Sequence, residues 1–139
     1  IREEIGDKFG IGVCLNNIGL THFNKGDYEN IFLHLQKAVN LLKETGTLGI
    51  ESVALFALAK KNLGKEYNKD EILKFIKKNE YREDYLNYIL YKLLEDSSYL
   101  ETAYNQVQEK ADNLEPDVAA KFLSYPIPKA IVEEWEKVK

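Results

Sequence analysis

The sequence predicts an all-α fold, an α-α superhelix (solenoid) of about three antiparallel helix pairs followed by a C-terminal capping helix. Apolar residues recur at the i, i+3, i+4, i+7 spacing of one helix face along most of the 139 residues. Short turns interrupt this pattern, and two of their glycines, Gly26 and Gly64, are 38 residues apart. With 45% hydrophobic and 30% charged residues, the chain can form a core and is not typical of disordered proteins.

The first predicted helix runs from about Ile11 to Asn24. We expect the residues before it to be the end of another helix, broken at Gly6-Asp7, with a flexible joint at residues 10–12. Gly19 lies inside the predicted helix, where it costs about 1 kcal/mol relative to Ala, so it should mark the close approach of a second helix. The apolar face of this helix is expected to contain Ile11, Cys14, Leu15, Ile18 and Phe23.

A tight turn and a second amphipathic helix follow. Gly26 is expected to adopt the left-handed conformation that ends a helix, and Asp27 to cap the next helix, Tyr28 to Lys43. The apolar stripe of that helix contains Ile31, Leu35, Ala38, Val39 and Leu42. A link this short requires the two helices to pack antiparallel.

The remaining helices are predicted from the same periodicity. Pro116 suits the first turn of a short helix, and the sequence YPIP at 125–128 should prevent helix formation. The predicted ranges are Ile50–Asn62, Lys69–Lys78 with Asn68 or Asp70 as its cap, Glu83–Glu95, Leu100–Leu114, Asp117–Ser124 and a capping helix Lys129–Val138.

Several of these residues resemble the tetratricopeptide repeat (TPR), a helix-turn-helix unit of about 34 residues. The matching residues are Leu15, Ile18, Gly19, Gly26-Asp27-Tyr28, Leu35 and Ala38, whereas His22, Ile31 and Lys43 depart from the pattern. The resemblance implies that residues 1–10 end a preceding repeat, 11–44 form the best-preserved repeat, 49–79 and 81–114 are degenerate repeats, and 116–139 are capping helices. It also implies that the chain is the C-terminal part of a bacterial TPR-containing protein.

The resemblance implies a binding groove lined by the first helix of each repeat. Asn side chains in such a groove can donate to and accept from the backbone of an extended peptide. The groove candidates are Val13, Asn16, Leu20, Phe23 and Asn24. Asn16 could instead be a solvated polar residue, because the equivalent position in the next unit is Ala54. A second candidate surface, or alternatively core, is formed by Tyr81, Tyr85, Tyr88 and Tyr91.

We therefore expect a scaffold module that binds a protein or an extended peptide within a larger bacterial signalling or regulatory protein. The chain contains no Met and begins with Ile1 inside a helical pattern, which suggests a piece of a longer protein. One alternative is a regulatory sensor domain of an upstream enzyme such as a cyclase or kinase. The other is a self-association module, which would make the protein a homo-oligomer.

Candidates for catalysis or metal binding are few. His22 and His34 fall on different predicted helices, and the single cysteine, Cys14, is expected to be a buried, inert thiol. We expect no catalytic centre, metal or cofactor, and no activity as an enzyme.

The charge pattern gives no reason to expect nucleic acid or membrane as a partner. The net charge is −4, and no apolar run approaches the roughly 18 residues of a membrane span. We expect a cytoplasmic protein. Residues 60–82 carry eight Lys or Arg against four acids, and residues 83–117 carry nine acids against two Lys. Such runs are typical of solvated helix faces, or of surfaces that select a partner.

Overall fold

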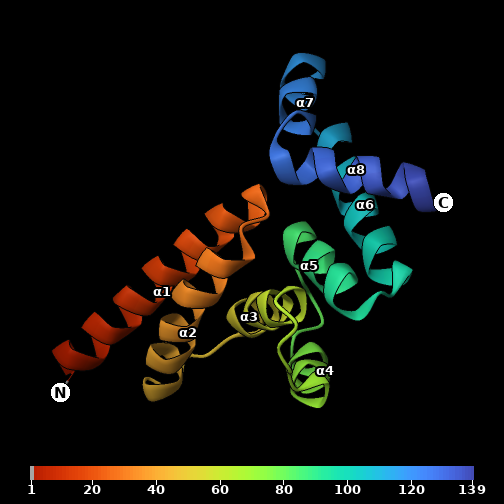
Figure 1. The fold of residues 1–139 in the computed structure, drawn as a ribbon. Helices are drawn as coiled ribbons and strands as arrows, with labels where there is room; N and C mark the ends of the chain where they lie inside the picture. Colours follow the sequence, from red (N-terminus) through yellow and green to blue (C-terminus); the bar gives the residue numbers. More distant parts are fainter. Residues whose placement is uncertain (1) are drawn as a thin grey trace. The chain divides into compact units, whose positions relative to one another are not determined.

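The computed structural model describes residues 2–139, with side chains from residue 6 onward, and confirms the all-α prediction (Figure 1). This part of the chain contains helices and no strand. The helices are α1 (Arg2–Lys25), α2 (Tyr28–Glu44), α3 (Ile50–Asn62), α4 (Lys69–Lys78), α5 (Asp84–Leu94), α6 (Ser97–Asp112), α7 (Pro116–Leu123) and α8 (Pro126–Val138). They form two compact units, Ile1–Glu80 and Tyr81–Lys139.

In the first unit, α1 and α2 form an antiparallel pair (Figure 1). Two glycines on one face of α1 allow the close approach. A Cβ atom on Gly12 would lie 2.8 Å from the Leu42 side chain, and one on Gly19 would overlap Leu35. Both leucines are buried. The predicted role of Gly19 is therefore confirmed. Gly12 has the same role nearer the N-terminus of α1, where it packs against Leu42.

The predicted break at Gly6-Asp7 is wrong, because α1 is a single helix from Arg2 onward. The predicted joint at residues 10–12 is wrong for the same reason. Residues 8–12 lie along the C-terminal half of α2, where Lys8 Nζ is 3.0 Å from Glu44 Oε2 and Gly12 packs on Leu42. These contacts offset the small helix-propensity cost of glycine. Ile1 lies outside the described residues.

The packing face of α1 also differs from the predicted apolar face. Ile11 and Ile18 are 52% and 41% exposed, and Cys14 is exposed rather than buried. The glycines determine which face meets α2, because only their side allows the two backbones to come close. The larger apolar residues are left on other sides of α1, apart from Phe23, which shares the glycine face and is buried.

The turn between α1 and α2 forms as predicted. Gly26 has φ +70°, and the Asp27 carboxylate accepts a hydrogen bond from Asn30 N at 3.3 Å. Hydrogen bonds from the Asn30 side chain and backbone lower the pKa of Asp27. The predicted stripe of α2 is also confirmed: Ile31, Leu35, Ala38 and Leu42 are buried, and Val39 is half-buried.

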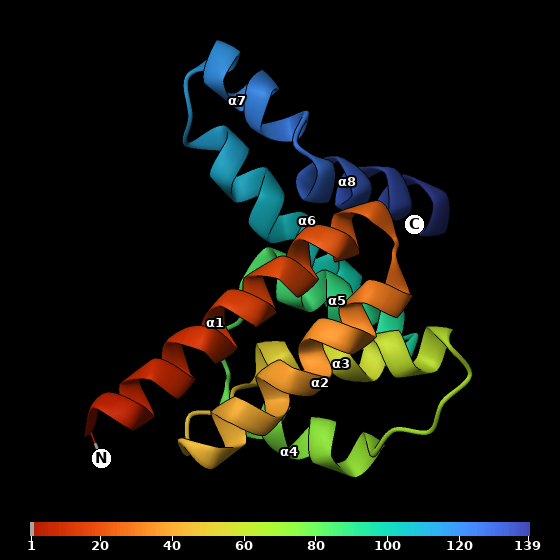
Figure 2. The same ribbon diagram turned by 60° about the vertical axis from the view of Figure 1, so that its left-hand side comes forward.

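The bounds of α3 and α4 agree with the prediction. Asn68 caps α4 by accepting from Glu71 N at 3.1 Å. α3 packs against α2 and α4 (Figure 2) and has buried residues around its circumference, including Ala54, Leu55 and Leu58. It therefore forms the centre of the first unit.

In the second unit, α5 and α6 form a pair joined through a buried amide. Asn87 is 1% exposed, and its Nδ2 donates to Gln106 Oε1 at 2.9 Å. Its Oδ1 accepts from Arg82 Nε at 3.1 Å, and Gln106 Nε2 donates to the Arg82 carbonyl at 2.6 Å. The polar groups of this buried side chain are therefore satisfied.

The final helices differ slightly from their predicted ranges. α8 begins at Pro126 rather than Lys129, because the first helical turn needs no N–H from Pro126 or Pro128. α8 packs on α6 and α5, with Ile131 fully buried and Trp135 stacked on Tyr104 at 5.4 Å between ring centroids. α8 thus covers the α5–α6 pair of its own unit. In contrast, α7 has no buried residue.

Candidate functional site

The sequence-predicted groove residues lie on one side of α1. Val13 and Asn24 are exposed and Leu20 is half-buried. Successive spacings of three to four residues place them on one flank of the continuous helix. Phe23 is 6% exposed and belongs to the core, so its expected place in the groove is wrong.

Asn16 lies at the edge of this flank, where α1 meets α3. Its Oδ1 accepts a hydrogen bond of 2.8 Å from the hydroxyl of Ser52, which is buried at the start of α3. This bond orients the amide and leaves Nδ2 as a donor at the surface. The structure thus brings Asn16 together with Ser52, a residue that sequence reasoning missed.

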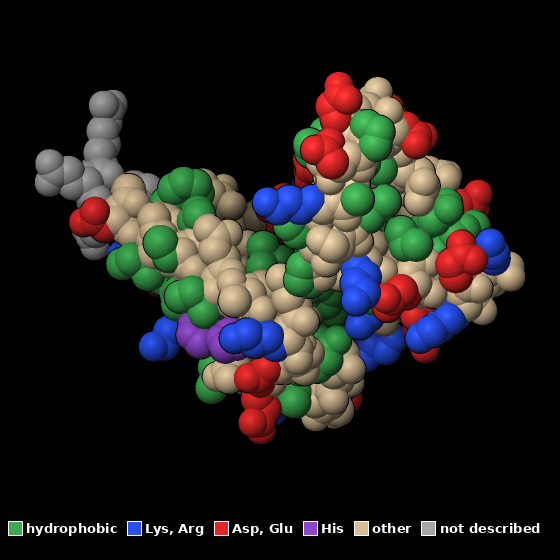
Figure 3. Space-filling view, turned by 90° about the horizontal axis from the view of Figure 1, so that it is seen from above, with side chains coloured by type: hydrophobic (Ala, Val, Ile, Leu, Met, Phe, Trp, Pro, Cys, Tyr) green, Lys and Arg blue, Asp and Glu red, His purple; other side chains and the backbone are tan. Residues whose placement is uncertain are grey.

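We name the set Val13, Asn16, Leu20 and Asn24 the α1 stripe. Other apolar side chains of α1 are also exposed, among them Phe9 at 44%, Ile11 and Ile18. In Figure 3, hydrophobic side chains lie along the part of the surface next to the residues drawn in grey. Extended apolar exposure of this kind is typical of surfaces that bind another protein.

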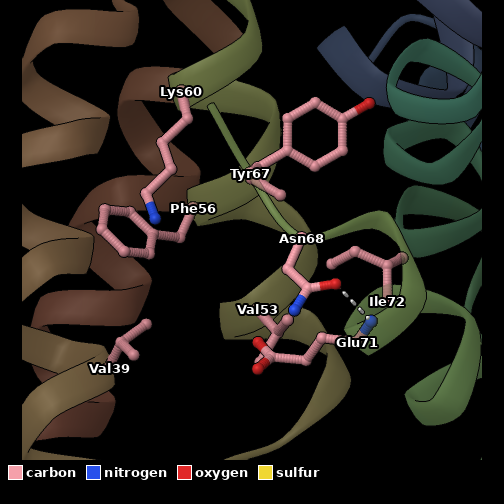
Figure 4. A pocket seen from close by; sticks show the side chains of 9 residues that line it. Val39, Val53, Phe56, Lys60, Tyr67, Asn68, Glu71 and Ile72 are labelled. Atoms are coloured by element: carbon pink, nitrogen blue, oxygen red, sulfur yellow. Dashed lines mark hydrogen bonds between the residues drawn. The ribbon is translucent and has the colours of Figure 1, made fainter. Parts of the chain in front are cut away.

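A pocket of about 170 Å³ opens between α2, α3 and α4 (Figure 4). Its apolar wall is formed by Val39, Val53, Phe56, Ala57 and Ile72, and its polar rim by Lys60, Tyr67, Asn68 and Glu71. In Figure 4, the Glu71 carboxylate lies across the pocket from Lys60. Small-molecule sites usually measure about 300–1,000 Å³, so this pocket suits one apolar side chain better than a cofactor.

A row of rings and ammonium groups extends from this pocket. Lys60 Nζ lies 4.3 Å from the Phe56 ring centroid, and the Phe56 and Phe32 centroids are 5.4 Å apart. Lys65 Nζ lies 5.0 Å from the Phe32 centroid. We name these four residues the aromatic–lysine row.

A shallow hollow of about 450 Å³ adjoins the other end of the row. It is lined by Glu29, Asn30, Phe32, Leu33, Leu63 and Lys65. The aromatic–lysine row therefore lies between the pocket and the hollow, with one ammonium group next to each. This surface could not be predicted from the sequence, because Phe56 and Ile72 are recognisable there only as apolar positions and the pocket depends on side chains from three helices.

The two histidines meet on the surface of the α1–α2 pair. The His22 and His34 rings are stacked with centroids 5.4 Å apart, and they form the purple patch in Figure 3. His22 Nδ1 lies 3.9 Å from Asp27 Oδ2 and has no hydrogen-bond partner. In the described part of the chain, no group of three or more His, Cys, Asp or Glu side chains is arranged to hold a metal.

The tyrosines do not form one surface. Tyr88 is buried, whereas Tyr81 is 76% exposed and precedes α5. The hydroxyl of Tyr91 donates to Glu134 Oε1 at 2.9 Å. Desolvation is the main cause that raises the pKa of Tyr91, and this hydrogen bond raises it further. Most of these residues therefore serve the packing of α5, which was the alternative left open by the sequence.

None of the described helices has the length and apolar character needed to cross a membrane. Comparisons of the chain with protein families, with characterised proteins and with solved structures find no match.

Proposed function

We propose that the chain is a binding module for an extended peptide segment of a protein partner, built from TPR-like helix pairs. α1–α2, α3–α4 and α5–α6 would be the three pairs, and α8 the cap. A cytoplasmic bacterial signalling or regulatory context and the absence of any covalent step are parts of this proposal.

One observation carries the proposal: the α1 stripe combines an exposed valine and a half-buried leucine with an amide that is hydrogen-bonded to a second helix. Val13 and Leu20 offer apolar contacts on either side of Asn16. The Ser52 hydroxyl donates to Asn16 Oδ1, so the Nδ2 group would be the one to donate to a ligand carbonyl. An amide that is already oriented loses little entropy when it binds.

The test starts from a displayed library of 12-residue peptides selected on the immobilised chain. For a selected peptide, Asn16→Ala and Leu20→Ala should each raise Kd about five- to tenfold, which corresponds to about 1–1.4 kcal/mol. Asn16→Asp keeps the acceptor for Ser52 and removes the donor, so it should also weaken binding. Isothermal titration calorimetry gives the Kd values.

Two variants serve as controls. Ser52→Ala removes only the orienting bond and should weaken binding less than Asn16→Ala. Leu73→Ala truncates a side chain on α4 that is 39% exposed and should leave Kd unchanged. Equal binding by the wild type, Asn16→Ala and Leu20→Ala would contradict the proposal.

A further inference from the structure

The two hollows and the aromatic–lysine row form a surface that no contact in the described first unit covers. Lys60 and Lys65 each lie over a ring, and the structure gives neither of them an ion pair with a described residue. A cation held over a ring retains its attraction for an anion on its open side. The surface thus offers, in order, a pocket with an apolar wall and a polar rim, two cations and a mainly apolar hollow.

Acids around this surface restrict where a ligand carboxylate can lie. Glu71 lies across the pocket from Lys60 (Figure 4), and Glu29 lies one helical turn before Phe32 at the shallow hollow. Like charges at these positions repel a carboxylate. The favourable position is therefore over the row itself, between Lys60 and Lys65.

The second unit carries an exposed segment with the complementary pattern. The α6–α7 turn has the sequence Leu114-Glu115-Pro116-Asp117-Val118, in which two apolar side chains flank two carboxylates. Leu114 is 39% exposed and Val118 48% exposed, and Glu115 and Asp117 are exposed as well.

A proline and two backbone hydrogen bonds restrict the conformation of this segment. Pro116 occupies the first position of α7, and Ala119 N donates to the Glu115 carbonyl at 2.7 Å. Leu114 N donates to the Ala111 carbonyl at 3.1 Å. A segment ordered before binding loses less conformational entropy on association than a flexible loop.

We propose that the aromatic–lysine row and its two hollows bind residues 114–118 of a second copy of this chain. The carboxylates of Glu115 and Asp117 lie over Lys60 and Lys65, and Leu114 and Val118 enter the hollows on either side. Because each copy has both surfaces, the contact is head-to-tail and generates chains or closed rings. Its small area makes it a weak association.

The first experiment follows the average molar mass by sedimentation equilibrium from about 10 μM to 1 mM, the range suited to a weak contact. At about 50 mM salt the mass should rise with concentration, and at about 500 mM salt the rise should shrink because the ion pairs are screened. A monomer at every concentration in low salt would overturn the proposal.

The second experiment exchanges the charges. The receiving-surface variant, Lys60→Glu with Lys65→Glu, should be monomeric because acids then face acids. The turn variant, Glu115→Lys with Asp117→Lys, should be monomeric because cations face cations. Mixing the two variants restores both complementary pairings, so the mixture should associate although neither component does.

A matched control shows whether the effect is local. Lys74→Glu with Lys77→Glu makes the same change in net charge on α4 at exposed residues that line neither hollow, and should leave association within about twofold of wild type. Circular dichroism melts verify that every variant is folded. Association that persists in the folded receiving-surface variant, or a mixture no more associated than its components, would overturn the proposal.

Discussion

Glycines within the same helix have opposite effects on packing. A Cβ on Gly19 would overlap the fully buried Leu35, whereas a Cβ on Gly10 would meet nothing within 4 Å. Sequence reasoning could identify Gly19 as a contact point because a glycine inside an amphipathic pattern needs a reason. It could not separate Gly10 from Gly12, since that distinction depends on where α2 lies.

We predict that Gly10→Ala stabilises the protein by about 0.5–1 kcal/mol, because alanine favours the helix and meets no neighbour. Gly19→Ala should instead destabilise it by about 1 kcal/mol or more, because overpacking outweighs the gain in helix propensity. Urea unfolding of both variants measures the difference. A destabilised Gly10→Ala would mean that α1 is not helical at this point.

The buried amide of Asn87 is a second feature of single residues that we can test. Asn87→Ala removes the side-chain hydrogen bonds to Gln106 Oε1 and from Arg82 Nε at a buried position and should cost about 1–3 kcal/mol. Asn105→Ala, on the exposed side of α6, should change the free energy of unfolding by less than about 0.5 kcal/mol. Similar losses in the two variants would contradict a structural role for the Asn87 network.

At the scale of elements, the sequence predicted the existence of all the helices from α2 to α8 and both bounds of α3 and α4. Periodicity and caps are local signals, and Gly26, Asp27 and Asn68 behave as their residue types suggest. The errors in the predicted helices occur where contacts between residues far apart in the sequence determine the structure. α1 extends because α2 supports its first half, and the exposure of Ile11, Ile18 and Cys14 follows from which face meets α2.

The helix caps predict how stability depends on acid. Hydrogen bonds from Asn30 lower the pKa of Asp27, and those from Ser98 lower the pKa of Asp96 at the start of α6. A carboxyl group with a lowered pKa in the folded state contributes stability above its unfolded value of about 3.8. This contribution is lost as the pH falls through the lowered pKa.

Thermal melts between about pH 5 and pH 2 test this dependence. The double variant Asp27→Asn, Asp96→Asn retains cap acceptors that do not titrate. Its melting temperature should therefore fall less steeply with acid than that of the wild type. Parallel curves for the two proteins would exclude the caps as contributors.

At the scale of the whole chain, the division into two units was not visible in the sequence, where α4 and α5 read as consecutive members of one array. The connection between them, residues 79–83, is not helical and carries Tyr81, which is 76% exposed.

The proposed binding surfaces also depend on how several helices pack together. The sequence predicted the α1 stripe in part, but the pocket is formed by residues that look like ordinary core positions.

We predict that chymotrypsin cuts the folded chain first after Tyr81, because proteases select exposed segments that can unfold locally. Mass spectrometry of a brief digest should show fragments 1–81 and 82–139 before others. Tyr125, 48% exposed and placed between α7 and α8, is the internal control for an exposed tyrosine at a shorter connection. A first cut inside α1–α4 would contradict the division.

The burial of α3 around its circumference has a consequence for motion. The hydrogen-bonded amides in the middle of α3 should therefore be among the slowest to exchange with deuterium, whereas those of α7, which has no buried residue, should exchange early. Val53, Phe56 and Ala57 on α3 form one wall of the pocket. The pocket wall therefore lies on the segment that opens least often, so it exists before any ligand arrives, and a side chain can enter it without waiting for the helices to rearrange.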